Sequence, residues 1–246
     1  MAATFRSRGK TMAEADFNVE TLAAYLHISP PQVMKLIEQG RLPGRRVGGE
    51  WRFSSAEIHH WLEERIGLSS DEELQRMEGA LQRVYGPDEE TISIAEMLPI
   101  SAIAVPLPAR TRSSVIDEMV SVAARTTWLW DLEKMTDAIR AREELMPTAL
   151  DNGVALLHPR RPLSNILDRP FLAFGRCDRG MPFGNSRGVL TDLFFLICSI
   201  DDGTHLRTLA RLSRLLGDEK FVDALRDAPD AASAHQTIAD FEERLP

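Results

Sequence analysis

The chain has 246 residues, 43% of them hydrophobic, which is enough for two modest domains or one large one. Its net charge of -8 excludes a uniformly basic surface of the kind that coats nucleic acid. Nucleic acid could still be bound by a locally basic element. With two cysteines, Cys177 and Cys198, the chain can build neither a disulfide framework nor a four-cysteine zinc site, and a reducing cytoplasm fits best.

The first residues carry positive charge, but no apolar core follows them. No later segment is a long uncharged apolar span of the kind that crosses a membrane. We therefore expect a soluble, cytoplasmic protein that does not enter a membrane. We also expect residues 1–16 to form a disordered tail.

Two short helices are predicted after the tail. In "NVETLAAYLH" the apolar residues recur on one helical face, and the pattern halts just before Ser29. The stretch "SPPQVMKLIEQG" then begins a second helix, with Ser29 as its cap and Gln32 placed to complete a capping box. A helix-turn-helix is the expected result.

A β-hairpin and a third helix complete this first module, which we place at residues 17–67. "RLPGRRVGGEWRF" predicts strands over residues 45–47 and 50–53. Gly48 and Gly49 join them, because glycine tolerates the positive φ angles of a two-residue hairpin loop. "SSAEIHHWLEERIG" predicts the third helix.

Residues 68–91 are predicted to connect this module to the rest of the chain. "SSDEELQRMEGALQRVYG" has a capping box and an apolar helical stripe made of Leu74, Met77, Leu81 and Val84. The stripe either packs on a domain of its own chain or forms a dimerisation seam. "GPDEE" then marks the domain boundary.

From residue 92 to residue 246, helical patterns alternate with apolar strands. "SSVIDEMVSVAARTT", "DLEKMTDAIRAREELM", "HLRTLARLSRLLG" and "EKFVDALRDA" predict helices, whereas "GVALL", "FLAFG" and "LTDLFFLICSI" predict strands. The last strand is too apolar to face water on either side, which indicates a buried sheet and an α/β (α+β) fold class. "APDAASAH" is interpreted as a short alanine-rich turn.

The predicted helix-turn-helix and hairpin of the first module are suited to binding DNA. The second helix of a helix-turn-helix enters the major groove, and cations on the hairpin meet phosphates or the adjacent minor groove. The candidate DNA-binding residues are therefore Gln32 and Lys35 on the second helix, and Arg45, Arg46 and Arg52 on the hairpin. The alternatives are that Gln32 is used up by the capping box and that the arginines form an ordinary solvated hairpin.

The stretch "LAAYLHISPPQVMKLIEQGRLPGRRVGGEWRFSSAEIHHWL" resembles the excisionase and MerR-like winged helix-turn-helix family, with a glycine before the wing, a Trp-Arg pair and a closing Trp-Leu. This resemblance implies a DNA-binding domain in the first quarter of the chain. Acidic residues on the module, among them Glu38 and Glu50, weaken the DNA affinity of a single copy. We therefore expect a homodimer on a two-fold-related DNA site.

In the second part of the chain, "DNGVALLHPRRPL" places His158 at the end of a short apolar strand. A neutral imidazole is a good phosphoryl acceptor near neutral pH, and the end of a buried strand holds the ring at the mouth of the sheet. Arg160 and Arg161 favour the neutral ring and attract an incoming anion. His158 is therefore a candidate nucleophile.

A second histidine follows in "SIDDGTHLRTL". His205 falls in the first turn of a predicted helix, capped by Thr204 or Asp202, where the helix dipole favours a bound anion. We expect His205 to meet His158 and to hydrogen-bond a phosphoryl group on it. A metal held by the two rings is the alternative, but no third ligand is fixed by spacing, so neither a metal nor a cofactor is expected.

Two stretches, "AREELMPTALDNGVALLHPRRPL" and "DLFFLICSIDDGTHLRTLARLSRLL", resemble the enzyme IIA domain of the fructose, mannitol and nitrogen-regulatory branch of the bacterial phosphotransferase system. The resemblance covers residues 92–246 and implies a mixed sheet flanked by helices. It implies that His158 accepts a phosphoryl group from a small histidine phosphocarrier protein and that His205 supports it. Arg142 and Thr148 match positions near that site.

The chain also departs from that family. Met146, Ala149 and Asp151 replace glycines that are usual in the loop, and Leu157 and Pro159 flank the histidine where proline and glycine are usual. Glycine allows close approach, whereas Pro159 removes an N–H group and favours an extended His158. Whether the domain acts as a phosphohistidine phosphotransferase therefore stays open at this point.

The leading hypothesis is a cytoplasmic DNA-binding transcriptional regulator whose enzyme IIA-like domain accepts a phosphoryl group from the phosphocarrier. One alternative is a phosphocarrier transferase of the nitrogen-type relay, in which the helix-turn-helix serves for docking. The other is a catalytically silent sensor that acts by binding proteins.

Overall fold

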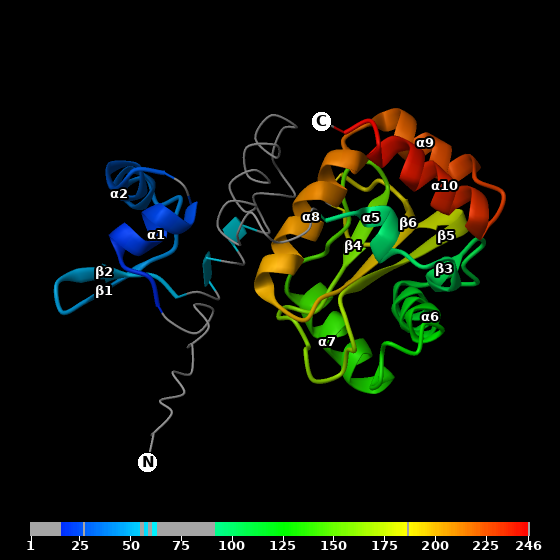
Figure 1. Ribbon diagram of the computed structural model, residues 1–246, viewed down its shortest axis with the longest axis horizontal. Helices are drawn as coiled ribbons and strands as arrows, with labels where there is room; N and C mark the ends of the chain where they lie inside the picture. Colours follow the sequence, from blue (N-terminus) through cyan, green and yellow to red (C-terminus); the bar gives the residue numbers. More distant parts are fainter. Residues whose placement is uncertain are drawn as a thin grey trace, which may run out of the picture. The chain divides into compact units, whose positions relative to one another are not determined.

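The computed structural model of the chain divides into two compact units, residues 1–64 and 65–246 (Figure 1). It describes residues 16–26, 28–54, 57–58, 61–62, 92–185 and 187–245. The expected tail, apart from Asp16, and the expected connecting helix with its apolar stripe lie outside the described residues. Each unit is considered by itself below.

The first unit contains the predicted helix-turn-helix. Helix α1 (Val19–Leu26) packs on helix α2 (Pro30–Glu38), and the completely buried Leu22 and Val33 come from the two helices. The backbone N–H of Ser29 donates to Gln32 Oε1 at 2.7 Å, as the capping box predicts. This bond fixes where the second helix begins.

The hairpin follows in the predicted register. Strands β1 (Arg45–Val47) and β2 (Glu50–Arg52) are antiparallel, and the two loop glycines have φ angles of +62° and +88°. The predicted second strand included Phe53, which instead makes an isolated bridge with Phe17. A Cβ atom at Gly44 would lie 2.7 Å from the Phe53 ring, so the chain needs a glycine where it enters the hairpin.

The second unit is built on a mixed four-stranded sheet with the order β3-β5-β6-β4. Its strands are β3 (Ile103–Ala104), β4 (Val154–Leu157), β5 (Phe171–Met181) and β6 (Thr191–Cys198). Strand β4 runs parallel to β6, and β5 runs antiparallel to β6. Every residue of β4 is buried, which explains its continuous apolar pattern.

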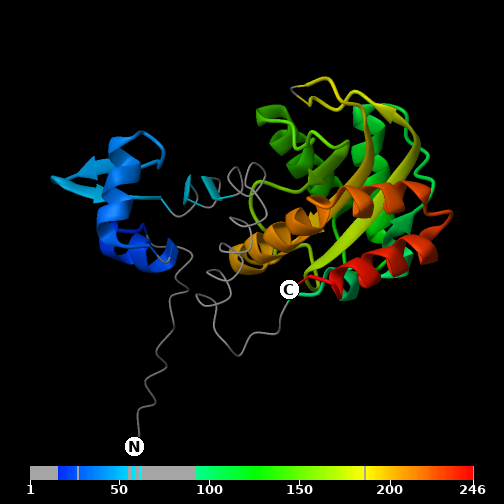
Figure 2. The same ribbon diagram turned by 90° about the horizontal axis from the view of Figure 1, so that it is seen from above.

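Helices cover both faces of this sheet, as the turned view in Figure 2 shows. Helices α6 (Arg112–Ala124) and α7 (Leu132–Leu145) lie on one face, where they share a core with alternate strand residues such as Leu157 and Leu196. The other face is covered by α8 (Asp202–Leu216), α9 (Glu219–Asp227) and α10 (Ala231–Glu242). Short elements α5 (Ile94–Met97) and η2 (Ile100–Ala102) precede β3.

Two sequence interpretations of this unit were wrong. "APDAASAH" is not a turn but the capped start of α10, because the Asp230 carboxylate accepts the Ser233 N–H at 2.8 Å. Strand β5 does not stop at Gly175 but continues to Met181. Charged residues interrupt the apolar run in its second half, where the strand is partly exposed.

A buried carboxylate, Glu242, ties α10 to the start of α5. It accepts the backbone N–H groups of Ile94 and Ala95 at 2.7 and 2.9 Å, and the guanidinium of Arg211 at 2.7 Å. Burial alone would raise the pKa of Glu242, but the two N–H groups and Arg211 together lower it. The carboxylate is therefore stabilised in its charged form.

Glu242→Gln is expected to lower the free energy of unfolding by about 2 kcal/mol at neutral pH, because two buried N–H groups and the partly buried Arg211 lose a charged acceptor. The folded-state pKa of Glu242 lies below 4.5, so the stabilisation is present above that pH and is lost as the pH falls further. Calorimetry at pH values above and below this threshold measures the difference in the free energy of unfolding between the variant and the wild type. Substitution of its exposed neighbour, Glu243→Gln, is the control. If both variants lose the same free energy of unfolding, the Glu242 carboxylate does not tie α10 to α5.

Candidate functional site

Two parallel strands bring the predicted site residues to one edge of the sheet. Because β4 and β6 are parallel, His158 after β4 and Ser199 after β6 lie at the same edge. Leu157 belongs to the core under α6 and α7, and successive residues of an extended chain alternate between faces. His158 is therefore directed toward the opposite face, where α8 begins.

The structure brings the two imidazoles together, as the sequence interpretation required. Their ring centroids are 5.1 Å apart and the ring planes are inclined by 49°. His158 is 3% exposed and His205 is 4% exposed. Nδ1 of His158 lies 2.8 Å from the carbonyl oxygen of Leu156. A carbonyl only accepts, so this nitrogen carries a proton, and the lone pair of the neutral ring is on Nε2.

His205 lies in the first turns of α8, as predicted, but the cap is a different residue. The side chain of Asp201 accepts the Thr204 N–H at 2.8 Å, so neither Thr204 nor Asp202 caps the helix. Nδ1 of His205 lies 3.2 Å from Ser199 Oγ. The sequence analysis missed Ser199, and the only signal for it was a hydroxyl residue directly after the most apolar strand.

The other two predicted residues bond to α7 and its loop rather than to the imidazoles. The buried Arg142 donates from Nη1 to the carbonyl oxygen of Met146 at 2.7 Å. The Thr148 hydroxyl donates to the Glu143 carboxylate. Thr148 is nevertheless a neighbour of β4, because its carbonyl oxygen accepts the Leu156 N–H at 3.3 Å. It therefore supports the strand that carries His158.

Glu143 is a second residue that the sequence analysis missed. It is 2% exposed and accepts the Thr148 N–H at 3.2 Å and the Arg112 guanidinium at 3.1 Å. Arg112 also donates to the Glu143 carbonyl oxygen at 2.5 Å. This network joins α6, α7 and the segment beside β4. In the sequence, the Arg-Glu pair within "AREELMPTAL" was the signal that could have pointed to Glu143.

The residues that follow His158 differ in exposure. Pro159 is buried, whereas Arg160 and Arg161 are exposed and form no ion pair among the described residues. Their charges are thus available to an anion that approaches this edge of the sheet. The thiols add no nucleophile, because burial raises the pKa of Cys177 to about 11 and raises that of Cys198 further.

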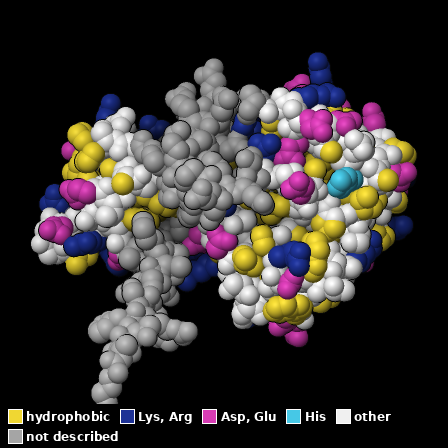
Figure 3. All heavy atoms as spheres, in the orientation of Figure 1, with side chains coloured by type: hydrophobic (Ala, Val, Ile, Leu, Met, Phe, Trp, Pro, Cys, Tyr) yellow, Lys and Arg dark blue, Asp and Glu magenta, His cyan; other side chains and the backbone are white. Residues whose placement is uncertain are grey.

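The candidate DNA-binding residues of the hairpin all have side-chain partners. Arg45 pairs with Asp16 at 3.0 Å and Arg52 pairs with Glu50 at 2.9 Å. Arg46 stacks over the Trp51 ring at 5.3 Å from its centroid. In Figure 3 the hairpin end of the first unit accordingly shows basic side chains beside acidic ones. Of the three arginines, only Arg46 has an aromatic ring rather than a carboxylate as its partner.

The candidates on the second helix differ in how they are used. Lys35 is exposed on α2. Gln32 uses its amide oxygen to accept the Ser29 N–H, so reading a base through that oxygen would break the helix cap. Lys35 is therefore the better placed of the two for contact with DNA.

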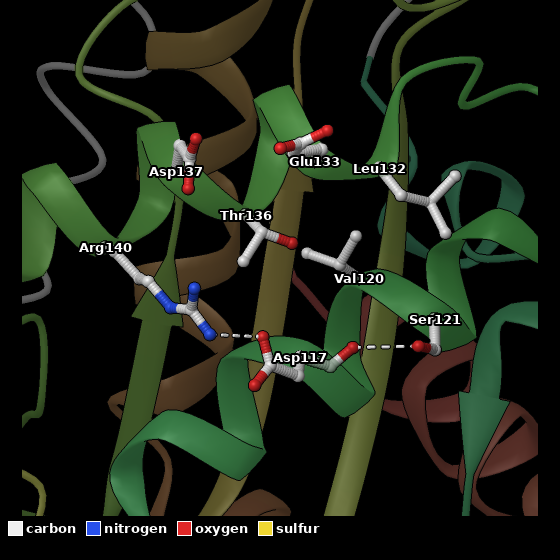
Figure 4. A pocket seen from close by; sticks show the side chains of 8 residues that line it. All are labelled: Asp117, Val120, Ser121, Leu132, Glu133, Thr136, Asp137 and Arg140. Atoms are coloured by element: carbon white, nitrogen blue, oxygen red, sulfur yellow. Dashed lines mark hydrogen bonds and ion pairs between the residues drawn. The ribbon is translucent and has the colours of Figure 1, made fainter.

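An open pocket of about 340 Å³ lies between α6 and α7, away from the imidazoles. Figure 4 shows that Arg140 points toward Asp117, with which it pairs at 2.6 Å. None of the predicted site residues lines this pocket. Within the described parts of the chain, no group of three metal-ligating side chains is present and no helix is long and apolar enough to span a membrane.

Comparison with known proteins decides the family of the second unit. Residues 96–241 match the family described as "Phosphoenolpyruvate-dependent sugar phosphotransferase system, EIIA 2". The chain belongs to this family. Residues 17–66 match a helix-turn-helix domain, so the protein joins an EIIA domain to a helix-turn-helix.

Curated relatives agree with this assignment. A nitrogen regulatory protein of Bradyrhizobium diazoefficiens is 30% identical over 148 residues, which is 59% of this chain and 94% of that protein. A fructose-specific EIIABC component of Bacillus subtilis is 31% identical over 139 residues, 56% of this chain. The match spans only 21% of that larger protein, so it concerns its EIIA-like part alone.

Solved structures support the fold. The nitrogen regulatory protein IIA-Ntr of Neisseria meningitidis superposes with a TM-score of 0.53 at 22% identity, covering 59% of this chain and 98% of that one. A IIA domain from Streptococcus pyogenes M1 GAS also gives 0.53, at 16% identity, covering 62% and 97%. The mixed sheet with helices on both faces is therefore the EIIA fold, as the sequence resemblance implied.

Thr148→Val is expected to lower the free energy of unfolding by about 1 to 2 kcal/mol, because the buried Glu143 carboxylate loses a hydroxyl donor. Thermal unfolding of the second unit measures the change. The control is Thr237→Val, whose hydroxyl donates only to the Ser233 carbonyl within helix α10. If the two variants lose the same small amount of unfolding free energy, the Thr148 hydroxyl does not stabilise the segment beside β4.

Proposed function

We propose that the protein is a transcriptional regulator that binds DNA and whose EIIA domain accepts a phosphoryl group on His158. The observation that carries this proposal is the pairing of His158 with His205 at the end of a parallel strand pair. EIIA family membership supports a histidine phosphocarrier protein as the donor. DNA is the partner that the helix-turn-helix and its arginine-bearing hairpin favour.

The chemistry needs little from the protein beyond positioning. The lone pair on His158 Nε2 attacks phosphorus, and the bond from phosphorus to the donor nitrogen breaks with its electron pair left on the donor ring. The proton on His158 Nδ1 stays in place, held by the Leu156 carbonyl oxygen at 2.8 Å. His205 lies close enough to contact the transferred group, and Arg160 and Arg161 lower the cost of bringing an anion to this edge.

The burial of both rings sets a condition on this step. With exposures of 3% and 4%, the imidazoles are not reachable by a donor protein until covering residues move. The same burial, together with the buried Pro159, favours a second candidate function. In that function the domain is a catalytically silent sensor, which binds a phosphotransferase protein through its surface without accepting the group.

A phosphoryl group adds close to two negative charges where none existed. In the proposed regulator this charge changes the contacts of the EIIA domain with its neighbours, and thereby the affinity for DNA. We place the protein in the cytoplasm, where the phosphotransferase relay operates, and expect it to act as a homodimer. A phosphocarrier transferase, the remaining alternative, would pass the group to an acceptor and would have no affinity for DNA.

Incubation with phosphoenolpyruvate, enzyme I and the phosphocarrier protein is expected to add one acid-labile phosphoryl group per chain, detected by intact-mass spectrometry. His158→Ala should abolish the gain, because the attacking nitrogen is removed. His235→Ala should keep it, since the only hydrogen bond of that half-buried histidine to the described residues is with the Ala95 carbonyl oxygen on another part of the unit. No gain in the wild type, despite a stable complex with the carrier, would favour the silent sensor.

Arg46→Ala is expected to weaken DNA binding more than Arg45→Ala or Arg52→Ala, because no carboxylate of the described residues pairs with Arg46. The dependence of affinity on salt should fall by about one phosphate contact per DNA-binding module. Gel-shift titrations at several salt concentrations measure both quantities.

The matched control for this experiment is Arg169→Ala. Arg169 also stacks on a tryptophan, Trp128, at 4.8 Å from the ring centroid, although it pairs in addition with Asp168 at 2.9 Å, and it lies in the EIIA domain. Its removal should leave the salt dependence unchanged. Equal DNA affinity for the wild type and all three hairpin variants would count against the hairpin as a DNA contact.

A further inference from the structure

Ser199 lies between β6 and α8 and is 1% exposed. Among the described residues its hydroxyl has one hydrogen-bond partner, Nδ1 of His205 at 3.2 Å. The Ser199 carbonyl oxygen accepts the Leu163 N–H at 3.1 Å, so the main chain of this residue is also held. We propose that Ser199 is a positioning residue that fixes His205 as the tautomer with its proton on Nε2.

A hydroxyl and a neutral imidazole can bond in two ways. Either the Ser199 O–H donates to His205 Nδ1, or His205 Nδ1–H donates to Ser199 Oγ. In the second arrangement the hydroxyl hydrogen needs a different acceptor, and none lies within hydrogen-bond distance in the described part of the chain. A buried donor without an acceptor is unfavourable, so the first arrangement is favoured, with the ring proton on Nε2.

The two histidines then have opposite tautomers. The Leu156 carbonyl oxygen requires a proton on His158 Nδ1 and leaves the lone pair on Nε2. The Ser199 hydroxyl requires the reverse in His205, and this leaves an N–H donor on Nε2. With the ring centroids 5.1 Å apart, one ring supplies the nucleophile and the other supplies a hydrogen-bond donor for the phosphoryl oxygens.

This inference rests on the proposed phosphorylation of His158 for its functional consequence, but not for its structural content. The transfer itself forms one bond from phosphorus to His158 Nε2 and breaks the bond to the donor nitrogen. His205 neither gains nor loses a proton in this step. Its Nε2–H only becomes bonded to an oxygen of the transferred group, which stabilises that group against loss to water.

The first test reads the tautomers directly in the unphosphorylated full-length chain. Long-range proton–nitrogen correlation spectra at mildly alkaline pH, where histidines are neutral, report which nitrogen carries the proton. His205→Gln and His158→Gln assign the two sets of signals. The expected result is Nε2–H for His205 and Nδ1–H for His158. A proton on Nδ1 of His205 would overturn the proposal, whatever the protein's activity.

The second test uses Ser199→Ala, with Ser213→Ala as its matched control. Ser213 is another buried serine, on α8, whose hydroxyl has no hydrogen-bond partner among the described residues. Ser199→Ala should shift the His205 tautomer signals and make the phosphorylated protein hydrolyse roughly tenfold faster, by analogy with the lower end of the effect of hydrogen-bond partners that orient metal-binding histidines. Ser213→Ala should change neither quantity.

A double-variant comparison separates positioning from a general packing effect. If Ser199 acts through His205, then Ser199→Ala should have no further effect on hydrolysis in a His205→Gln background. An undiminished effect in that background would overturn the proposal. Failure to label the wild type at all would refute the proposed function, whereas the tautomer spectra would still decide whether Ser199 positions His205.

Discussion

The candidate site depends on the parallel pairing of β4 with β6. The register pairs Leu157 with Leu196, so the two strands end side by side and the histidine after β4 meets the helix after β6. A shift of this register by one residue would exchange the faces of β4. His158 would then be directed into the core under α6 and α7, away from His205. The apolar side chains that fix the register are therefore as necessary to the site as the imidazoles.

Two buried carboxylates stabilise this arrangement from opposite faces of the sheet. Glu143 joins α6 and α7 to the segment beside β4, and Glu242 joins α10 and α8 to α5. Each is paired with an arginine and with at least one backbone N–H group, which is what a buried charge requires. Such bonds specify positions more strictly than apolar packing does, because a displaced carboxylate would lose several partners together.

Local patterns made the first unit predictable from the sequence. The capping box at Ser29 and the Gly48-Gly49 loop depend only on residues within a few positions of each other, and both formed as predicted. The second half of β5 was missed because its charged residues break the apolar pattern, and pairing with β6 holds it as a strand. The start of helix α10 was missed because a run of alanines after a proline was interpreted as a turn, although alanine is the best helix former.

The candidate site was only partly predictable for the same reason. The sequence marked His158 and His205 by their places at a strand end and a helix start, but their 5.1 Å separation follows from the sheet order. Ser199 and Glu143 carried only weak signals, a hydroxyl residue directly after a strand and an Arg-Glu pair, since the role of each is defined by a partner that the fold brings close. The cap is Asp201, one residue before the predicted Asp202 and three before the predicted Thr204, and helix boundaries are commonly uncertain by one or two residues.

The burial of the imidazoles also limits how the proposed phosphorylation could act on the proposed DNA binding. Charges in solution are screened over about 8 Å at physiological ionic strength, so added charge acts strongly only on groups close to it. In the proposed regulator, a phosphoryl group at His158 would therefore act mainly on groups close to the ring. Within the EIIA domain these lie at the edge where β4 ends and α8 begins, and a movement that exposes the rings to the donor would itself change contacts at that edge. We therefore expect the proposed signal to begin at this edge, where α8 starts.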